Sequence, residues 1–345
     1  MSMGLLRVFA VPLVLLAGLV SAVGSGGGGS WSFGSGHSWG PLFPPPGIAP
    51  VDITPTNARA VSATVVQAFA RLSDVTVTLG GQVFPAPPAA PALLPGNSKF
   101  GLFEIVSASG ESVTAPCAVS GTVTVSGRPG NAPVFPAEQD TFDLVFNACN
   151  DGDGFVLDGR FALLFSELEG DVRTDVFRLR YTLREMTLEV LAGRIRHTVS
   201  TNPGFMLGWD SLAFPVAGLT AGTGLLMLAS PADVYSWRDG ELYREINADI
   251  SIPGILEAAS KTLMQSDVLG GSLYYETITP LAFTDGQVPE SGEILISEWG
   301  AEGTIRIVIE SAAVVRLETD EDGDGVVDDD RLTTWPELLG EKSHR

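Results

Sequence analysis

The sequence predicts an all-β fold in which long antiparallel hairpins form a curved sheet, half-barrel or sandwich, with one N-terminal amphipathic helix. Two observations carry this prediction. From about Phe100 onward apolar and polar residues alternate, which is typical of strands with one buried face. Clusters of Gly, Asn and Asp separate these runs, and no regular alternation of strands with helices indicates a parallel sheet.

Individual elements have their own patterns. Apolar residues spaced three and four apart predict a helix over Thr56–Leu72. Five prolines within Phe84–Asn97 exclude regular structure from that stretch. The clearest strands are Val119–Val125, Thr141–Ala148, Phe177–Val190, Gly292–Ser297 and Thr304–Glu310.

The start of the chain has the layout of a secretory signal peptide. Arg7 precedes an uncharged run over 8–20, and small residues follow at Ser21, Ala22 and Gly24. This run is shorter than the roughly 20 residues that a membrane-spanning helix needs. We therefore expect residues 1–24 to be removed on export, which leaves a mature chain without a transmembrane helix.

The remaining residues divide by composition. Residues 25–50 are rich in Gly, Ser and Pro and are expected to form a disordered tether. Residues 51–215, which hold both cysteines, and residues 216–345, which hold an acidic loop, are expected to form two β regions. The length also fits one continuous domain.

The chain is strongly acidic, with 41 acidic and 20 basic residues and a formal net charge of −21. Such a surface repels nucleic acid and attracts divalent cations, so nucleic-acid binding is excluded. Cys117 and Cys149 are the only cysteines. In an exported chain they are expected to form a disulfide, and the alternative of a catalytic cysteine lacks a nearby histidine in the sequence.

The sharpest local motif is an acidic loop near the C-terminus. It places carboxylates at positions 1, 3, 5 and 9 of a calcium-binding pattern and Gly325 at position 6. The candidate calcium ligands are Asp320, Asp322, Asp324 and Asp328, and Asp329 and Asp330 could complete the site. Arg331 replaces the glutamate that an EF-hand has at position 12. The alternative is a plain acidic turn between strands Val314–Leu317 and Leu332–Trp335. Asn150–Gly154 is interpreted as a plain hairpin turn because Cys149 occupies its position 1.

No catalytic set assembles from the sequence, so no enzyme is predicted. Ser38 lies in a G-x-S-x-G run, but this run belongs to the tether and not to a strand–turn–helix. The histidines are His37, His197 and His344, and the carboxylate pairs considered are Glu167 with Glu169 and Glu241 with Glu245. The aromatic residues of the C-terminal half fit core anchors better than a carbohydrate or lipid surface. They are Trp209, Trp237, Trp299, Trp335, Tyr235, Tyr243, Tyr274 and Tyr275.

Several segments together resemble a known group of proteins. Gly270–Pro280, Pro289–Ile296, Ala313–Asp320 and Trp335–Leu338 are similar to the C-terminal part of uncharacterised proteobacterial envelope lipoproteins. Cys117 and Asn147–Gly152 resemble an Asn-x-Cys-x-Asp-Gly turn of the same proteins. The acidic loop resembles the DxDxDG loops of thrombospondin type 3 repeats.

The resemblance fails at one position that matters for anchoring. Val23 stands where a lipobox has the cysteine that receives the lipid. The expected location is therefore the periplasm or the extracellular space, without a lipid anchor.

Three functions remain open at this point. The first is non-catalytic binding or carriage of a lipid or other apolar small molecule, which requires inward-facing apolar positions that line a cavity rather than pack solid. The second is a structural or surface-interaction protein with a filled core, stabilised by calcium, whose partner is an envelope protein. The third is a secreted hydrolase, which would have to use His197.

Overall fold

The computed structural model describes residues 49–83, 98–128, 137–152, 155–172, 177–192, 195–201, 205–210, 218–223, 225–229, 234–238, 241–247, 254–259, 261–283, 288–300 and 302–339. All of them belong to one compact unit, Leu42–Arg345. The expected signal peptide and nearly all of the expected tether lie outside the described residues. So does the proline-rich stretch at 84–97.

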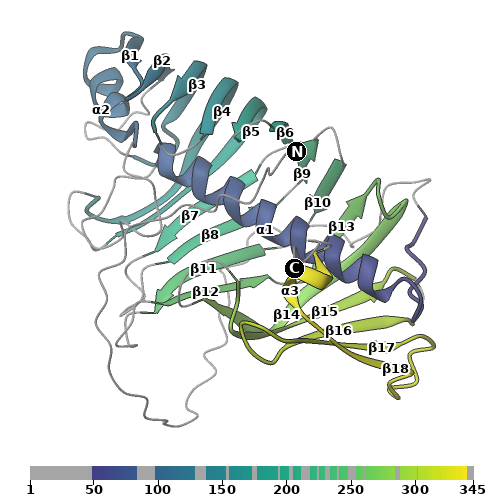
Figure 1. Ribbon diagram of the computed structural model, residues 1–345. Coiled ribbons are helices and arrows are strands. Elements are labelled where there is room, and N and C mark those ends of the chain that lie inside the picture. Colours follow the sequence, from purple (N-terminus) through teal and green to yellow (C-terminus); the bar gives the residue numbers. More distant parts are fainter. Residues whose placement is uncertain are drawn as a thin grey trace. The chain divides into compact units, whose positions relative to one another are not determined.

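The all-β prediction is confirmed (Figure 1). The helices are α1 (Ala58–Val83), α2 (Phe100–Ser109) and α3 (Trp335–Leu338). The strands are β1 (Val113–Pro116), β2 (Ser120–Arg128), β3 (Thr141–Asn150), β4 (Phe155–Gly170), β5 (Phe177–Ala192), β6 (Ile195–Thr201), β7 (Phe205–Asp210), β8 (Gly218–Thr223), β9 (Leu225–Ala229), β10 (Val234–Arg238), β11 (Glu241–Asn247), β12 (Gly254–Ala259), β13 (Thr262–Ser266), β14 (Gly271–Phe283), β15 (Ser291–Glu298), β16 (Thr304–Ile309), β17 (Val315–Asp320) and β18 (Asp329–Thr333).

The strands form one antiparallel meander in which neighbours in sequence are neighbours in the sheet. Some of its long strands are described in two segments. Leu188 of β5 pairs with Val199 of β6, and Leu183 of β5 pairs with Phe205 of β7, so β6 and β7 lie end to end along β5. The same pairing pattern places β8 and β9 end to end, and likewise β10 with β11 and β12 with β13. The sheet then continues from β14 to β18.

Helix α1 is longer than its sequence predicts. The expected helix ends at Leu72, whereas α1 continues for a further eleven residues to Val83. This extension contains the β-branched run Val75–Thr78 and two glycines, all of which disfavour a helix. Every residue from Thr78 to Val83 is buried. Burial in the core, rather than intrinsic propensity, therefore stabilises the second half of α1.

Helix α2 replaces the strand pattern that was expected from Phe100 onward, and this prediction is wrong. Phe100, Phe103 and Val106 are its buried residues, which gives the spacing of three that one helix face requires. Gly110 ends the helix with a φ of 71° and donates its N–H to Val106 O. Phe103 packs against Phe142 and Phe165, with ring centroids 4.9 and 6.2 Å away.

The C-terminal hairpin lies where the sequence predicts it, but its second strand ends earlier than expected. Strand β18 stops at Thr333, so the expected strand over Leu332–Trp335 is wrong at Trp335, which begins α3. Thr334 and Glu337 form a capping box, since each side chain bonds the backbone N–H of the other residue. No helix in the described part of the chain is long and apolar enough to cross a membrane.

Candidate functional site

The layer between α1 and the sheet is the largest feature that bears on function. One continuous core contains residues of α1, such as Val65, Phe69 and Leu72, and inward-facing residues of strands from β2 to β17. Phe69 meets the ring of Tyr275 on β14 edge-on, with centroids 6.2 Å apart. The sheet therefore has inward-facing apolar residues, and α1 packs in the same core.

The helices and the sheet also contain buried polar atoms without a hydrogen-bond partner. Within the described part of the chain, Ser62 Oγ and Gln82 Oε1 on α1 are buried and unpartnered, and so are Ser272 Oγ and Thr319 Oγ1 on the sheet. Trp335 Nε1 of α3 belongs to the same group. Such atoms cost about 1–3 kcal/mol each when they leave water. The contact between α1 and its surroundings is therefore less favourable than an all-apolar layer would be.

The N-terminal end of α1 is held to the sheet by backbone contacts. Val51 donates its N–H to Ser272 O at 2.9 Å, and Ser272 donates to Ala49 O at 3.0 Å. Ile53 donates its N–H to the buried carboxylate of Glu298. At the second residue of the helix, Arg59 donates to Glu337 O of α3.

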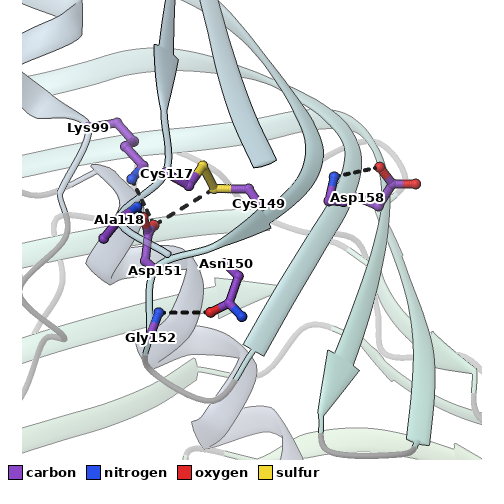
Figure 2. The surroundings of a disulfide bond; sticks show 9 residues. Lys99, Cys117, Ala118, Cys149, Asn150, Asp151, Gly152 and Asp158 are labelled. Carbon is purple, nitrogen blue, oxygen red and sulfur yellow. Dashed lines mark hydrogen bonds and ion pairs between the residues drawn. A yellow bond between two sulfur atoms is a disulfide. The ribbon is translucent and has the colours of Figure 1, made fainter. Parts of the chain in front are cut away.

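The C-terminal end of α1 is held through a buried ion pair beside the disulfide (Figure 2). Gln82 O accepts the N–H of Lys99 at 2.8 Å. Lys99 Nζ lies 2.7 Å from Asp151 Oδ2, and the two side chains are only 9% and 3% exposed. Asp151 Oδ1 also accepts the N–H of Ala118 at 2.9 Å.

The expected disulfide joins Cys117 to Cys149, with their Cα atoms 5.5 Å apart. Both cysteines are buried, and Cys149 Sγ lies 3.8 Å from Asp151 Oδ2. These three residues are close together, but the two sulfur atoms are bonded to each other and are not available to a metal ion. Asn150 Oδ1 accepts the N–H of Gly152 at 2.8 Å, which gives the described part of this loop the expected turn.

The acidic loop brings three of the four candidate calcium ligands together. One carboxylate oxygen each from Asp320, Asp322 and Asp328 lies within 4.8 Å of the others. Asp324 does not belong to this group. Its Oδ1 accepts the N–H of Val326 at 2.7 Å.

The loop carboxylates also bond the loop backbone. Asp320 accepts the N–H groups of Gly323 and Gly325, at 2.7 and 2.9 Å. Asp328 Oδ2 accepts the N–H of Glu321 at 2.7 Å. The same side chains therefore stabilise the turn and gather negative charge at one point.

Asp329 and Asp330, which could complete a calcium site, contact arginines instead. Asp329 lies 2.6 Å from Arg331, and Asp330 lies 3.0 Å from Arg316. Arg316 also contacts Glu310 at 2.6 Å, and this hydrogen bond is the main reason why the pKa of Arg316 is raised. These two aspartates belong to a charged network on the surface of the last strands.

The catalytic candidates do not form a site within the described residues. Glu167 lies 2.8 Å from Arg180, and Glu169 lies 2.9 Å from Arg178, so both carboxylates are in ion pairs. His197 lies on β6, and Glu241 and Glu245 lie on β11, but their side chains lie outside the described parts. Ser38, His37 and His344 lie outside the described residues altogether.

The buried aromatic residues follow the prediction of core anchors. Trp335, Tyr274 and Tyr275 are all buried. Trp299 is half-buried, and the side chains of Trp209, Trp237, Tyr235 and Tyr243 lie outside the described parts.

Sequence reasoning missed the pair of Lys99 and Asp151. Lys99 is one of only three lysines in the chain, and it directly follows the proline-rich stretch. A cation that is rare in the sequence and borders a helix is the signal that could have drawn attention to this position.

Comparison with known proteins does not assign this arrangement to a family. No family model, no curated protein and no solved structure matches the chain.

Proposed function

We propose that the protein is an exported, non-catalytic carrier that binds a lipid or another apolar molecule in the layer between α1 and the sheet. The observation that carries the proposal is the composition of this layer. It is continuous and apolar, yet it contains buried hydroxyl and amide groups, such as those of Ser62, Gln82 and Thr319, without partners. A layer built only for stability would replace such groups with apolar ones. An amphiphilic ligand would supply partners for them.

Two features of the sequence support export and a soluble carrier. The signal-peptide layout over residues 1–24 directs the chain out of the cytosol. Val23 at the position of the lipobox cysteine would release it from the membrane, as a carrier of apolar molecules requires. The resemblance to proteobacterial envelope lipoproteins supports a location in the periplasm or outside the cell.

The first experiment is native mass spectrometry of the mature protein, purified from a bacterial periplasm without detergent. We expect an adduct of lipid size on the folded chain. The delipidated protein is then titrated with N-phenyl-1-naphthylamine, a neutral apolar probe whose fluorescence rises in an apolar site. A saturable signal supports the carrier, whereas the absence of both adduct and saturable binding overturns it.

Two matched variants locate the probe. Phe69 is 3% exposed and faces β14, whereas Ile278 is 53% exposed on the same strand. Phe69→Leu should weaken probe binding by about three- to tenfold, because about 1 kcal/mol of apolar contact is lost. Ile278→Ser should leave binding unchanged. Equal loss in the two variants would indicate adventitious binding at the surface and would contradict the proposed site.

The acidic loop favours a second candidate, a surface-interaction protein stabilised by calcium. The grouping of Asp320, Asp322 and Asp328 carries it, because oxygen ligands at 2.3–2.6 Å from Ca²⁺ lie a few ångströms from one another. We expect calcium to raise the melting temperature above that in chelator, and the double variant Asp322→Ala/Asp324→Ala to abolish this rise. Asp330→Asn, on the same hairpin but outside the group, is the control. An equal melting temperature with calcium and with chelator would contradict the candidate.

A further inference from the structure

We propose that α1 opens from its C-terminal end, and that the buried ion pair between Lys99 and Asp151 is the latch that holds this end closed. The inference rests on the proposed function in one respect only, namely that an apolar molecule enters beneath the opened helix. The opening itself is a property of the protein alone and is tested without a ligand.

The first argument is the way in which each end of α1 is held. The N-terminal end is continuous with a segment that pairs with β14 through the backbone of Val51 and Ser272. It is held again by Ile53 with Glu298 and by Arg59 with Glu337. At the C-terminal end, Lys99 donates its backbone N–H to Gln82 O of α1, and the side chain of the same lysine forms the ion pair with Asp151.

The second argument is the weakness of the helix near that end. Residues from Ser73 to Val83 include a run of β-branched residues and Gly80-Gly81, all of low helix propensity, and the residues from Thr78 to Val83 are buried. Gln82 is buried with its Oε1 unpartnered, which makes the packed state less favourable still. The helical state of this segment therefore depends on the packing around it, so a change that loosens the packing should open the segment.

The third argument is the nature of the latch. A buried ion pair adds little net stability compared with an apolar pair, but the loss of one partner leaves the other charge buried and unpaired. Asp151 is fixed from the opposite side by the N–H of Ala118 and lies against the disulfide of Cys117 and Cys149. The pair therefore fixes Lys99, the N-cap residue of α2, to the turn beside the disulfide (Figure 2), and the backbone N–H of the same lysine bonds Gln82 O at the end of α1.

Hydrogen exchange measured by mass spectrometry on the mature, disulfide-bonded protein tests the latch. Asp151→Asn keeps an oxygen for Ala118 but removes the charge, and Lys99→Met removes the cation. In both variants we expect amides over 73–83 to exchange at least about tenfold faster than in the wild type. Amides over 58–70 and in β5 should keep their wild-type rates.

Glu169→Gln is the matched control, because it removes a carboxylate from an exposed ion pair with Arg178. It should leave exchange over 73–83 unchanged. Unchanged exchange over 73–83 in both Asp151→Asn and Lys99→Met would overturn the latch. Equal acceleration of 58–70, 73–83 and β5 would also overturn it, because that pattern is global unfolding.

The same variants separate the latch from the proposed function. If 73–83 opens but neither the variants nor the wild type bind N-phenyl-1-naphthylamine, the latch stands and the carrier function fails. If the wild type binds the probe but the variants exchange and take up probe at wild-type rates, the carrier function stands and the latch fails. If both hold, Asp151→Asn should take up the probe at least about tenfold faster than the wild type.

Discussion

Replacing Thr319 by valine should stabilise the protein, although the substitution removes a hydroxyl group. Thr319 lies on β17 with 0% of its surface exposed, and its Oγ1 has no hydrogen-bond partner in the described part of the chain. The side chain therefore loses the full hydration of its hydroxyl. Valine has the same shape and removes this penalty, so we expect the free energy of unfolding to rise by about 1–2 kcal/mol.

Urea unfolding of Thr319→Val, followed by tryptophan fluorescence in the presence of a calcium chelator, measures this change. Chelation matters because Thr319 O also accepts the N–H of Asp328 from the acidic loop. Thr124→Val is the control, since Thr124 Oγ1 lies 2.9 Å from Thr114 Oγ1 on the neighbouring strand. It should lose up to about 1 kcal/mol. A loss of more than about 1 kcal/mol in Thr319→Val would show that its hydroxyl has a partner, and would refute the reasoning.

Other consequences of the structure can be measured in the same way. Cys117→Ala/Cys149→Ala opens a link with a sequence separation of 32 and should lower the free energy of unfolding by about 3–4 kcal/mol in urea. A loss below about 1 kcal/mol would contradict a structural disulfide. Burial raises the pKa of Tyr181 above its usual 10.0, so its contribution is complete below pH 10 and is lost as the pH rises. Between pH 9 and 11 Tyr181→Phe should therefore lose less stability than the wild type, and equal losses would contradict the shift. Phe165→Ala should cost about 3–5 kcal/mol in urea, because Phe165 is fully buried against Phe142. A cost below about 1.5 kcal/mol would contradict the packing.

The strands were the most predictable part of the fold. Along β3, for example, alternation marks Phe142, Leu144 and Phe146 as buried, and the structure buries all three. The two longer helices were less predictable for opposite reasons. The second half of α1 has strand-like residues but is helical because the core surrounds it. Helix α2 is so apolar that its sequence does not distinguish a buried helix from a buried strand.

The candidate site was predictable only where its residues are close in sequence. The acidic loop is local, so the grouping of Asp320, Asp322 and Asp328 follows from their spacing. The pair of Lys99 and Asp151 joins residues 52 positions apart, and their contact depends on where α2 meets the turn after β3. The partner of a buried charge is set by the tertiary fold, which a single sequence does not reveal.

The order in which the chain can fold follows from its connectivity. A meander pairs each strand with the next, so most of the sheet can form progressively from hairpins. Helix α1 emerges first but cannot dock early. The contact of Ile53 with Glu298 spans 245 residues, and that of Arg59 with Glu337 spans 278. The apolar face of the sheet must therefore stay uncovered until α1, which precedes the described strands in the sequence, closes over it last.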